Sequence, residues 1–113
     1  MNPDNAAIIT FDIHCDRPSW AVHGTNPDYH DTKYRIYFNE DLITERNWNW
    51  PHDKYYLKEE IIVHADNSAH SLRLVPIMKF KEQATFTIEN FLIANKTCIN
   101  TIQDNLEITL TLQ

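Results

Sequence analysis

The sequence predicts an all-β protein, an antiparallel β-sandwich of jelly-roll or immunoglobulin-like kind with about seven strands. Isoleucine, threonine and valine supply 26 of the 113 residues, and these β-branched types are enriched in strands. Several segments alternate polar and apolar residues with a period of two, whereas no segment keeps a helical period over three turns. Sheets that are polar on one face bury the other, and two sheets packed face to face achieve this in a short chain. No linker or internal repeat is visible, so residues 1–113 are expected to form one domain.

The first half of the chain contains four expected strands, at residues 9–16, 33–38, 42–48 and about 54–65. In the second of them the expected inward residues are Tyr34, Ile36 and Phe38. Residues 39–41 are Asn, Glu and Asp, which favour a hairpin turn. In the fourth strand Glu59 interrupts the apolar face and Ile62 is out of phase, so a bulge or a short helical turn near Glu59–Glu60 is the alternative there.

The second half contains three expected strands, at residues 71–75, 85–93 and 106–112. Pro76 cannot donate to a ladder, so it either ends the first of these strands or places that strand at the edge of a sheet. In the second, a phase slip between Ile88 and Phe91 predicts a bulge at Glu89–Asn90. The last is the most regular, with Leu106, Ile108, Leu110 and Leu112 on one face. Residues 57–62 and 99–104 are the two segments in which a short helix is the alternative.

Charge and glycine content make several function classes improbable. Lysine and arginine number 10 against 16 acidic residues, a net charge of -6, which disfavours nucleic acid and an anionic membrane as partners. The single glycine, Gly24, excludes a glycine-rich phosphate loop, so we expect no nucleotide cofactor. No apolar run reaches the ~20 residues of a membrane span, and the opening MNPDNAAIITF has no signal-peptide pattern. We therefore expect a soluble chain without a signal peptide.

The cysteines and histidines form no strong metal or redox motif. Cys15 and Cys98 are far apart and adjoin apolar residues, so small buried side chains are favoured over a disulfide. Asp12, His14 and Asp16 share the outward face of the first strand, but alternate residues are ~6.5 Å apart and any solvated strand shows such a row. A loop gathers His23, Asn26, Asp28, Tyr29, His30 and Asp31. It lacks the glycine and the regular carboxylate spacing of a calcium loop, so no metal is expected.

Catalytic groups are equally sparse, and no enzyme activity is expected. Glu59 and Glu60 would point to opposite faces of a strand, which prevents a shared acid and base role. One of the two is instead a candidate buried carboxylate, with Arg46 or Arg73 as its partner. The serines and cysteines lie in no nucleophile-like context.

Aromatic residues supply the candidate partner-binding site. Trp48, Trp50, Tyr55 and Tyr56 flank a loop that Pro51 stiffens. Aromatic rings near loop tips serve as anchors in protein interfaces and as stacking platforms for sugars. The alternative is that Trp48 and Tyr55 are inward core residues at strand ends, with Trp50 the most exposed ring.

Three segments in the middle of the chain form a pattern of their own: YRIYFNEDLITERNWNWPHDKYYLKEEIIVH, then HSLRLV, then FTIENFLI. This pattern, over about residues 33–93, resembles small β-sandwich proteins of T4-like tailed bacteriophages, especially those of cyanobacteria. The resemblance rests on strand and loop residues rather than on a catalytic signature. It implies a structural subunit of the virion, such as a decoration, neck or tail accessory protein, that binds neighbouring virion proteins or further copies of itself. The alternative is a carbohydrate-binding module that uses Trp50, Tyr55 and Tyr56 as a stacking platform.

Overall fold

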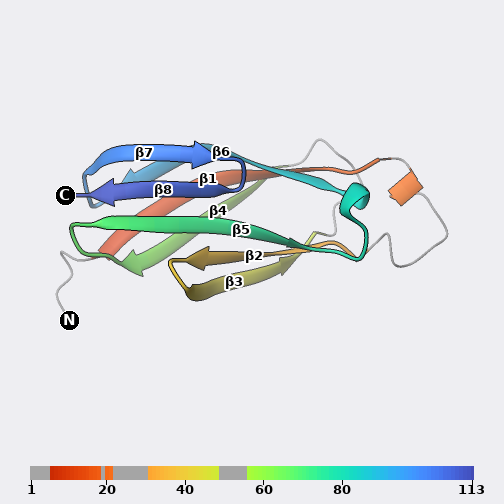
Figure 1. The fold of residues 1–113 in the computed structure, drawn as a ribbon, viewed down its shortest axis with the longest axis horizontal. Helices are drawn as coiled ribbons and strands as arrows, with labels where there is room; N and C mark the ends of the chain where they lie inside the picture. Colours follow the sequence, from red (N-terminus) through yellow and green to blue (C-terminus); the bar gives the residue numbers. More distant parts are fainter. Residues whose placement is uncertain (1–5, 19, 22–30, 49–55) are drawn as a thin grey trace.

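The computed structural model describes residues 6–18, 20–21, 31–48 and 56–113, and the statements below refer to these residues. In this part of the chain, eight antiparallel strands form two sheets (Figure 1). They are β1 (Ala6–Asp16), β2 (Lys33–Phe38), β3 (Asp41–Asn47), β4 (Tyr56–His64), β5 (Ala69–Ile77), β6 (Thr85–Ala94), β7 (Cys98–Asp104) and β8 (Glu107–Leu112). A 3₁₀ helix, η3 (Lys81–Gln83), lies between β5 and β6. The predicted all-β sandwich is confirmed.

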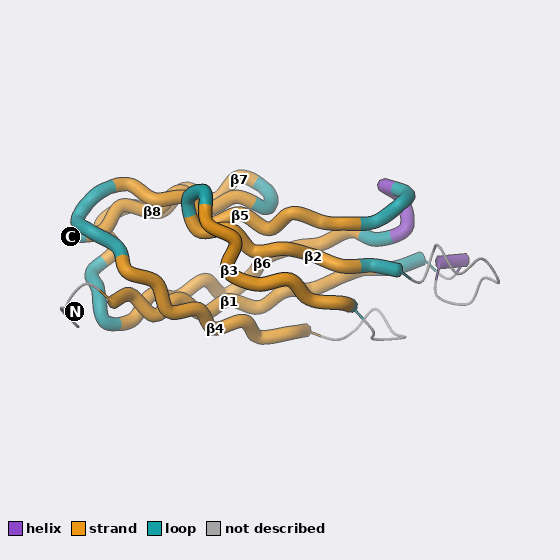
Figure 2. Tube along the Cα trace, turned by 90° about the horizontal axis from the view of Figure 1, so that it is seen from below, coloured by secondary structure: helices purple, strands orange, loops and turns teal. Residues whose placement is uncertain are grey.

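The smaller sheet has the strand order β4-β1-β6, and the larger has the order β3-β2-β5-β8-β7. Figure 2 shows the two sheets as separate layers, with β1, β4 and β6 in one of them. The smaller sheet pairs the first strand with two strands from later in the chain, so its order depends on contacts that are distant in sequence. No helix in the described ranges is long and apolar enough to cross a membrane.

The core lies between the sheets and follows from the alternation of apolar residues. Every second residue of β1 is buried, from Ala7 through Phe11 to Cys15. In β2 the buried residues are Tyr34, Ile36 and Phe38, as expected. Leu72 and Leu74 of β5 are likewise buried, again as expected. Burying this apolar surface is the main favourable term in folding, at roughly 25 cal/mol per Å².

The strand count is one more than expected, and the additional strand is β7. Its sequence, CINTIQD, lacks a regular apolar face, which is why a short helix was an alternative there. It pairs only with β8, so it lies at the edge of the larger sheet. Thr101 and Gln103 lie opposite the inward residues Leu110 and Ile108, whereas Ile102 lies on the outer face. An edge strand with a polar inward side gives a weak alternation signal.

Asparagine fills the backbone positions that glycine usually takes. The described non-glycine residues with positive φ are Asn39, Asn90, Asn95 and Asn105, at 55°, 56°, 74° and 56°. Asn39 and Asn105 each begin a two-residue turn, after β2 and after β7. Asparagine tolerates this left-handed conformation better than other residues with a Cβ atom. This explains how a chain with a single glycine forms several tight turns.

Three of the four edge strands contain one residue more than the strand beside them. The extra residue lies near Asn90 in β6, at Ile43 in β3 and at Ile99 in β7. The predicted bulge near Glu89–Asn90 is thus confirmed. The fourth edge strand, β4, pairs with β1 over nine consecutive positions without a shift. The alternative of a bulge or helical turn near Glu59 is therefore wrong, because Glu59 belongs to the regular inward alternation of β4.

Polar side chains link the two sheets along both open sides of the sandwich. On one side, Glu59 of β4 accepts hydrogen bonds from Tyr34 of β2 and Arg46 of β3. On the other, Gln103 Nε2 of β7 donates to the carbonyl oxygen of Ile88 in β6 at 3.0 Å. Each bond joins strands of different sheets, so the links restrict sliding of one sheet over the other.

Pro76 lies within β5 rather than ending it. Leu74 N–H points toward β8, because it donates to the carbonyl oxygen of Leu106 at 2.9 Å. Alternate residues of a strand point their backbone groups the same way, so Pro76 also faces that side. Pairing of β5 with β8 stops at Arg73, which leaves Pro76 beside an unpaired stretch of edge in the described structure. The expectation that Pro76 ends its strand or places that strand at a sheet edge is therefore wrong, because β5 continues to Ile77 and lies between β2 and β8. Proline is tolerated here because the side of β5 that its nitrogen faces is unpaired at this level.

Candidate partner-binding surface

The four aromatic residues assigned to partner binding fall into different environments. Trp48 is 1% exposed and its ring lies 6.1 Å, centroid to centroid, from that of Phe86 in the core. Trp48 is therefore an inward core residue, which was the alternative to partner binding, because its apolar ring packs between the two sheets. Tyr56, at the start of β4, is 53% exposed. Trp50 and Tyr55 lie outside the described residues.

The outer face of the three-stranded sheet carries a row of apolar side chains that are exposed except for the half-buried Ile8. Ile8 of β1 lies opposite Ile62 of β4 on one side and Ala94 of β6 on the other. Leu92, the next outward residue of β6, lies opposite Thr10. Ile62 and Leu92 are 65% and 66% exposed. We call Ile8, Ile62, Leu92 and Ala94 the outer apolar row.

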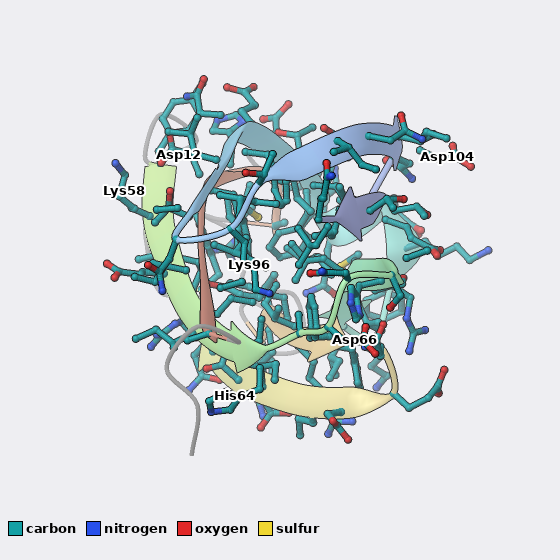
Figure 3. The ribbon with its side chains drawn as sticks, turned by 90° about the vertical axis from the view of Figure 1, so that its left-hand side faces the viewer. Asp12, Lys58, His64, Asp66, Lys96 and Asp104 are labelled. Carbon is teal, nitrogen blue, oxygen red and sulfur yellow. The ribbon has the colours of Figure 1, made fainter. Side chains whose placement is uncertain are left out.

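Charged residues flank the outer apolar row toward the other end of the strands. Asp12 lies opposite Lys58 of β4 and Glu89 of β6. Asp12 Oδ2 also accepts a hydrogen bond of 2.8 Å from Asn90, the residue at the bulge. Figure 3 shows Lys58 and Asp12 toward one end of β4 and His64 toward the other. The face therefore changes from apolar to charged along the strands.

Beyond the charged residues, Tyr56 stacks on His14. Their ring centroids are 4.8 Å apart with an interplanar angle of 30°. The two residues lie opposite each other at the end of the β1–β4 ladder. The phenol ring of Tyr56 is thus held in a defined orientation on the outer face while half of its surface stays exposed.

The inner face of β4 contains a buried carboxylate. Glu59 is 1% exposed, and its Oε1 accepts a hydrogen bond of 3.0 Å from the Tyr34 hydroxyl group. Arg46 donates from Nε to the same oxygen, and this raises the pKa of Arg46. Burial, followed by the charge of Glu59, raises the pKa of Tyr34. The expectation of a buried carboxylate paired with Arg46 is confirmed, and its role is to join the sheets.

The candidate metal ligands are not brought together in the part of the chain that the structure describes. There, no group of three or more His, Cys, Asp or Glu side chains is arranged to hold a metal ion. Asp12, His14 and Asp16 follow one another along β1, with Asp12 bonded to Asn90 and His14 stacked on Tyr56. Of the polar loop, only Asp31 is described, and it lies 3.9 Å from Lys33 Nζ. The remaining residues of that loop lie outside the described ranges.

A buried histidine, which the sequence did not single out, joins two turns. His70 is 9% exposed and stacks on Phe38. Asn39 Oδ1 accepts the backbone N–H of Ser71, so the Asn39 amide nitrogen faces His70 Nδ1, at 3.1 Å, as a donor. His70 Nδ1 is then the acceptor, and Nε2 donates to the backbone oxygen of Asp66 at 3.0 Å. This geometry assigns His70 a structural role.

A shallow groove of about 430 Å³ lies beside the turn between β7 and β8. It is lined by Arg73, Leu74, Val75, Pro76, Asp104, Asn105, Leu106 and Glu107. The Arg73 guanidinium group lies 5.0 Å from the centroid of the Tyr37 ring, and Arg73 is opposite Glu107 in the ladder. Both observations indicate that the Arg73 side chain is held by the neighbouring strands of its own sheet, β2 and β8.

Comparison with protein-family models, with curated proteins and with solved structures finds no match for this chain. The outer apolar row and the exposed Tyr56 are thus the features from which a function is inferred. One signal for the outer apolar row is visible in the sequence, because Ile62 and Leu92 are apolar residues out of phase with the inward alternation of their strands.

Proposed function

We propose that this chain is a non-enzymatic structural subunit of a tailed-phage virion that binds neighbouring capsid, neck or tail proteins. The observation that carries the proposal is the outer apolar row, in which Ile62 and Leu92 are each about two-thirds exposed. Exposed apolar residues gathered on one face of a folded domain are typical of contacts with other proteins. The resemblance of residues 33–93 to phage β-sandwich proteins is the reason for choosing a phage virion as the assembly.

The residues around the outer apolar row fit a protein interface. Lys58, Asp12 and Glu89 form a polar row beside it. Protein interfaces commonly have an apolar centre surrounded by a polar rim that remains accessible to water. The regular β1–β4 ladder holds these side chains on a preformed surface, which reduces the entropy lost on binding.

The test is incorporation of the chain into particles. Phage particles that encode the chain are purified, and its copy number is measured by quantitative mass spectrometry. Leu92→Ser should lower incorporation by at least about fivefold, because it removes an exposed apolar contact without opening the core. Leu42→Ser is the matched control, since Leu42 is 53% exposed on β3 of the other sheet. Absence of the wild-type chain from particles, or equal losses for the two variants, contradicts the proposal.

The second candidate is a carbohydrate-binding module, and the observation that favours it is the ring pair of Tyr56 and His14. An exposed aromatic ring held in a fixed orientation can stack on the apolar face of a sugar. The burial of Trp48 removes one ring from the platform considered above. Trp50 and Tyr55 would have to supply the others.

A glycan array tests this second candidate. Binding to a defined glycan should fall below detection in Tyr56→Ala and persist in Tyr56→Phe, because phenylalanine retains the ring. The same array with Leu92→Ser separates the two functions. Leu92 of β6 lies opposite Thr10, whereas Tyr56 of β4 lies opposite His14 at the end of the β1–β4 ladder, so this change leaves the ring pair intact. No glycan bound by the wild type rejects the carbohydrate function and leaves the virion proposal standing.

A further inference from the structure

The free edge of β4 differs from the other edges of the sandwich. β3, β6 and β7 each carry an extra residue that disrupts regular pairing. β4 has no such irregularity over its nine pairs with β1, and no described strand pairs with its other side. Bulges on edge strands hinder pairing with other chains, whereas a long regular edge permits it. β4 is therefore the edge that is best suited to accept another strand.

The direction of the backbone groups identifies which residues of β4 face this free edge. The carbonyl oxygen of Ala6 accepts a hydrogen bond from Asn95, which follows β6, so it points toward β6. Alternate residues share a direction, so Ala6, Ile8 and the further even-numbered residues of β1 face β6, and its odd-numbered residues face β4. Because odd residues of β1 lie opposite odd residues of β4, the even residues of β4 face the free edge.

Exposed side chains on this side of the chain are arranged symmetrically about Ile62. Lys58 and Glu60 precede Ile62, whereas His64, the last residue of β4, and Asp66, two residues beyond the strand, follow it at the same intervals. In the single chain the Asp66 carboxylate accepts a hydrogen bond from Ser68. All five are exposed. In an antiparallel pair of two such strands centred on Ile62, each Lys58 lies opposite Asp66 of the other copy. Each Glu60 likewise lies opposite His64, and Ile62 lies opposite Ile62 of the other copy, so no two like charges face each other.

We propose that two copies of this chain associate through antiparallel pairing of β4 with β4 about a twofold axis at Ile62. The partner is a second copy because pairing about Ile62 places Lys58 of each copy opposite Asp66 of the other and brings no like charges together, as a symmetric dimer requires. The result is a continuous six-stranded sheet with the order β6-β1-β4-β4-β1-β6. Backbone N–H and C=O groups of Glu60, Ile62 and His64 that face the free edge become paired. This dimer goes beyond the proposed function, since it forms whatever else the chain binds.

The dimer also extends the outer apolar row. Ile62 of each copy would lie beside Ile62 of the other, with Ile8 and Ala94 on either side. Directly opposite aliphatic side chains on one sheet face contact each other. The apolar side chains of the two copies would then form one row across six strands.

The first experiment measures the molecular mass of the full-length chain by sedimentation velocity over a concentration series up to roughly 100 µM, a range that detects weak dimers. The wild type should reach twice 13.4 kDa. Ile62→Lys places two like charges together at the axis and should raise the dissociation constant at least about tenfold. Leu92→Lys is the matched control, equally exposed on the same face but two strands from the axis. A monomeric wild type, or equal effects of the two variants, overturns the proposal.

The second experiment tests the register through the pair of Lys58 and Asp66. Lys58→Glu and Asp66→Lys each create like-charge contacts at both ends of a homodimer, so each should dimerise at least about tenfold more weakly than the wild type. An equimolar mixture of the two restores unlike charges at both ends and should form a heterodimer. Failure of the mixture to associate, when both variants keep the wild-type circular dichroism spectrum, overturns the register.

Amide hydrogen exchange followed by NMR gives a readout of the backbone pairing itself. The amide protons of Glu60, Ile62 and His64 should become protected as concentration rises, because they face the second copy. Those of Ile61 and Val63 face β1 and should be protected at every concentration. A dimer without this alternation uses another surface and overturns the proposal. Absence of the chain from phage particles would instead contradict only the proposed function.

Discussion

The hydroxyl group of Tyr34 donates a hydrogen bond of 3.0 Å to Oε1 of Glu59, and this bond passes through the core from the five-stranded to the three-stranded sheet. Arg46 donates to the same oxygen from the edge of the sandwich. A buried carboxylate costs free energy unless charged or polar donors satisfy it. Both donors bond to Oε1, whereas Oε2 is buried without a hydrogen-bond partner among the described residues. The two bonds to Oε1 thus offset part of the cost of placing Glu59 at an inward position of β4 that its neighbours fill with apolar residues.

Removing Arg46 should destabilise the protein because Arg46 is the one cationic group that pairs with Glu59 among the described residues. Arg46→Met keeps much of the aliphatic side chain and should lower the free energy of unfolding by roughly 1–3 kcal/mol, measured by urea denaturation. Arg35→Met is the matched control on the neighbouring strand, since Arg35 pairs with the exposed Glu45 at 2.7 Å. Exposed ion pairs contribute little, so this variant should differ little from the wild type. Equal losses in the two variants would show that the burial of Glu59 is not the cause.

Tyr34 should make the protein less stable in alkali. Burial, and then the charge of Glu59, raises the pKa of Tyr34 above its ordinary value of 10.0, so the folded state holds this proton more tightly than the unfolded state. The resulting stability is fully present below pH 10 and is lost as the pH rises through the raised pKa. Urea unfolding at a series of pH values from 8 upward should therefore show a steeper decline for the wild type than for Tyr34→Phe. Parallel declines would refute this linkage.

Much of the fold could be predicted because the inward faces of several strands are purely apolar. β2 covers residues 33–38 as expected, and β8 retains its regular alternation of Ile108, Leu110 and Leu112. β7 was harder to predict because the inward side of an edge strand can be polar, as at Gln103. The order of strands could not be predicted, since it depends on which strands meet across long stretches of sequence.

The candidate surface was predictable only in part. Ile62 is visible in the sequence as an apolar residue out of phase, but its place beside Ile8 and Ala94 depends on the registers of two ladders. Trp48 ends the strand expected at residues 42–48, and the sequence left open whether its ring binds a partner or lies in the core; packing against Phe86 buries it. Local sequence pattern indicates which side a residue faces within a strand, and tertiary packing decides what covers that side.

The two cysteines should differ in reactivity. Burial raises the pKa of the Cys15 thiol to about 12, so only on the order of one molecule in ten thousand carries the reactive thiolate at pH 8. Both cysteines are free, and Cys98 is partly exposed at the start of β7. A disulfide-exchange reagent should modify one thiol rapidly in the folded protein and two in urea. Cys98→Ser should abolish the rapid phase, and its persistence would place Cys15 at the surface.

The turn asparagines should respond differently to glycine, although both have positive φ. Asn39 bonds through its side chain to Ser71 N–H at 3.0 Å and to His70 Nδ1 at 3.1 Å, and it fixes the turn after β2 against β5. Asn39→Gly keeps the favourable backbone but loses both bonds, so it should lower the free energy of unfolding by about 1–2 kcal/mol.

Asn105 is the matched position, with a φ of 56° against 55° for Asn39. Among the described residues the Asn105 side-chain amide makes no hydrogen bond, and only its backbone oxygen accepts one, from Gln103. Asn105→Gly should therefore change the free energy of unfolding by less than about 0.5 kcal/mol. Asn105→Ala should cost about 1 kcal/mol, since alanine pays the steric cost of the left-handed conformation. Thermal or urea unfolding of the three variants decides the matter. If Asn39→Gly is as mild as Asn105→Gly, asparagine serves at both turns through its backbone conformation alone, and the contacts with Ser71 and His70 add nothing to stability.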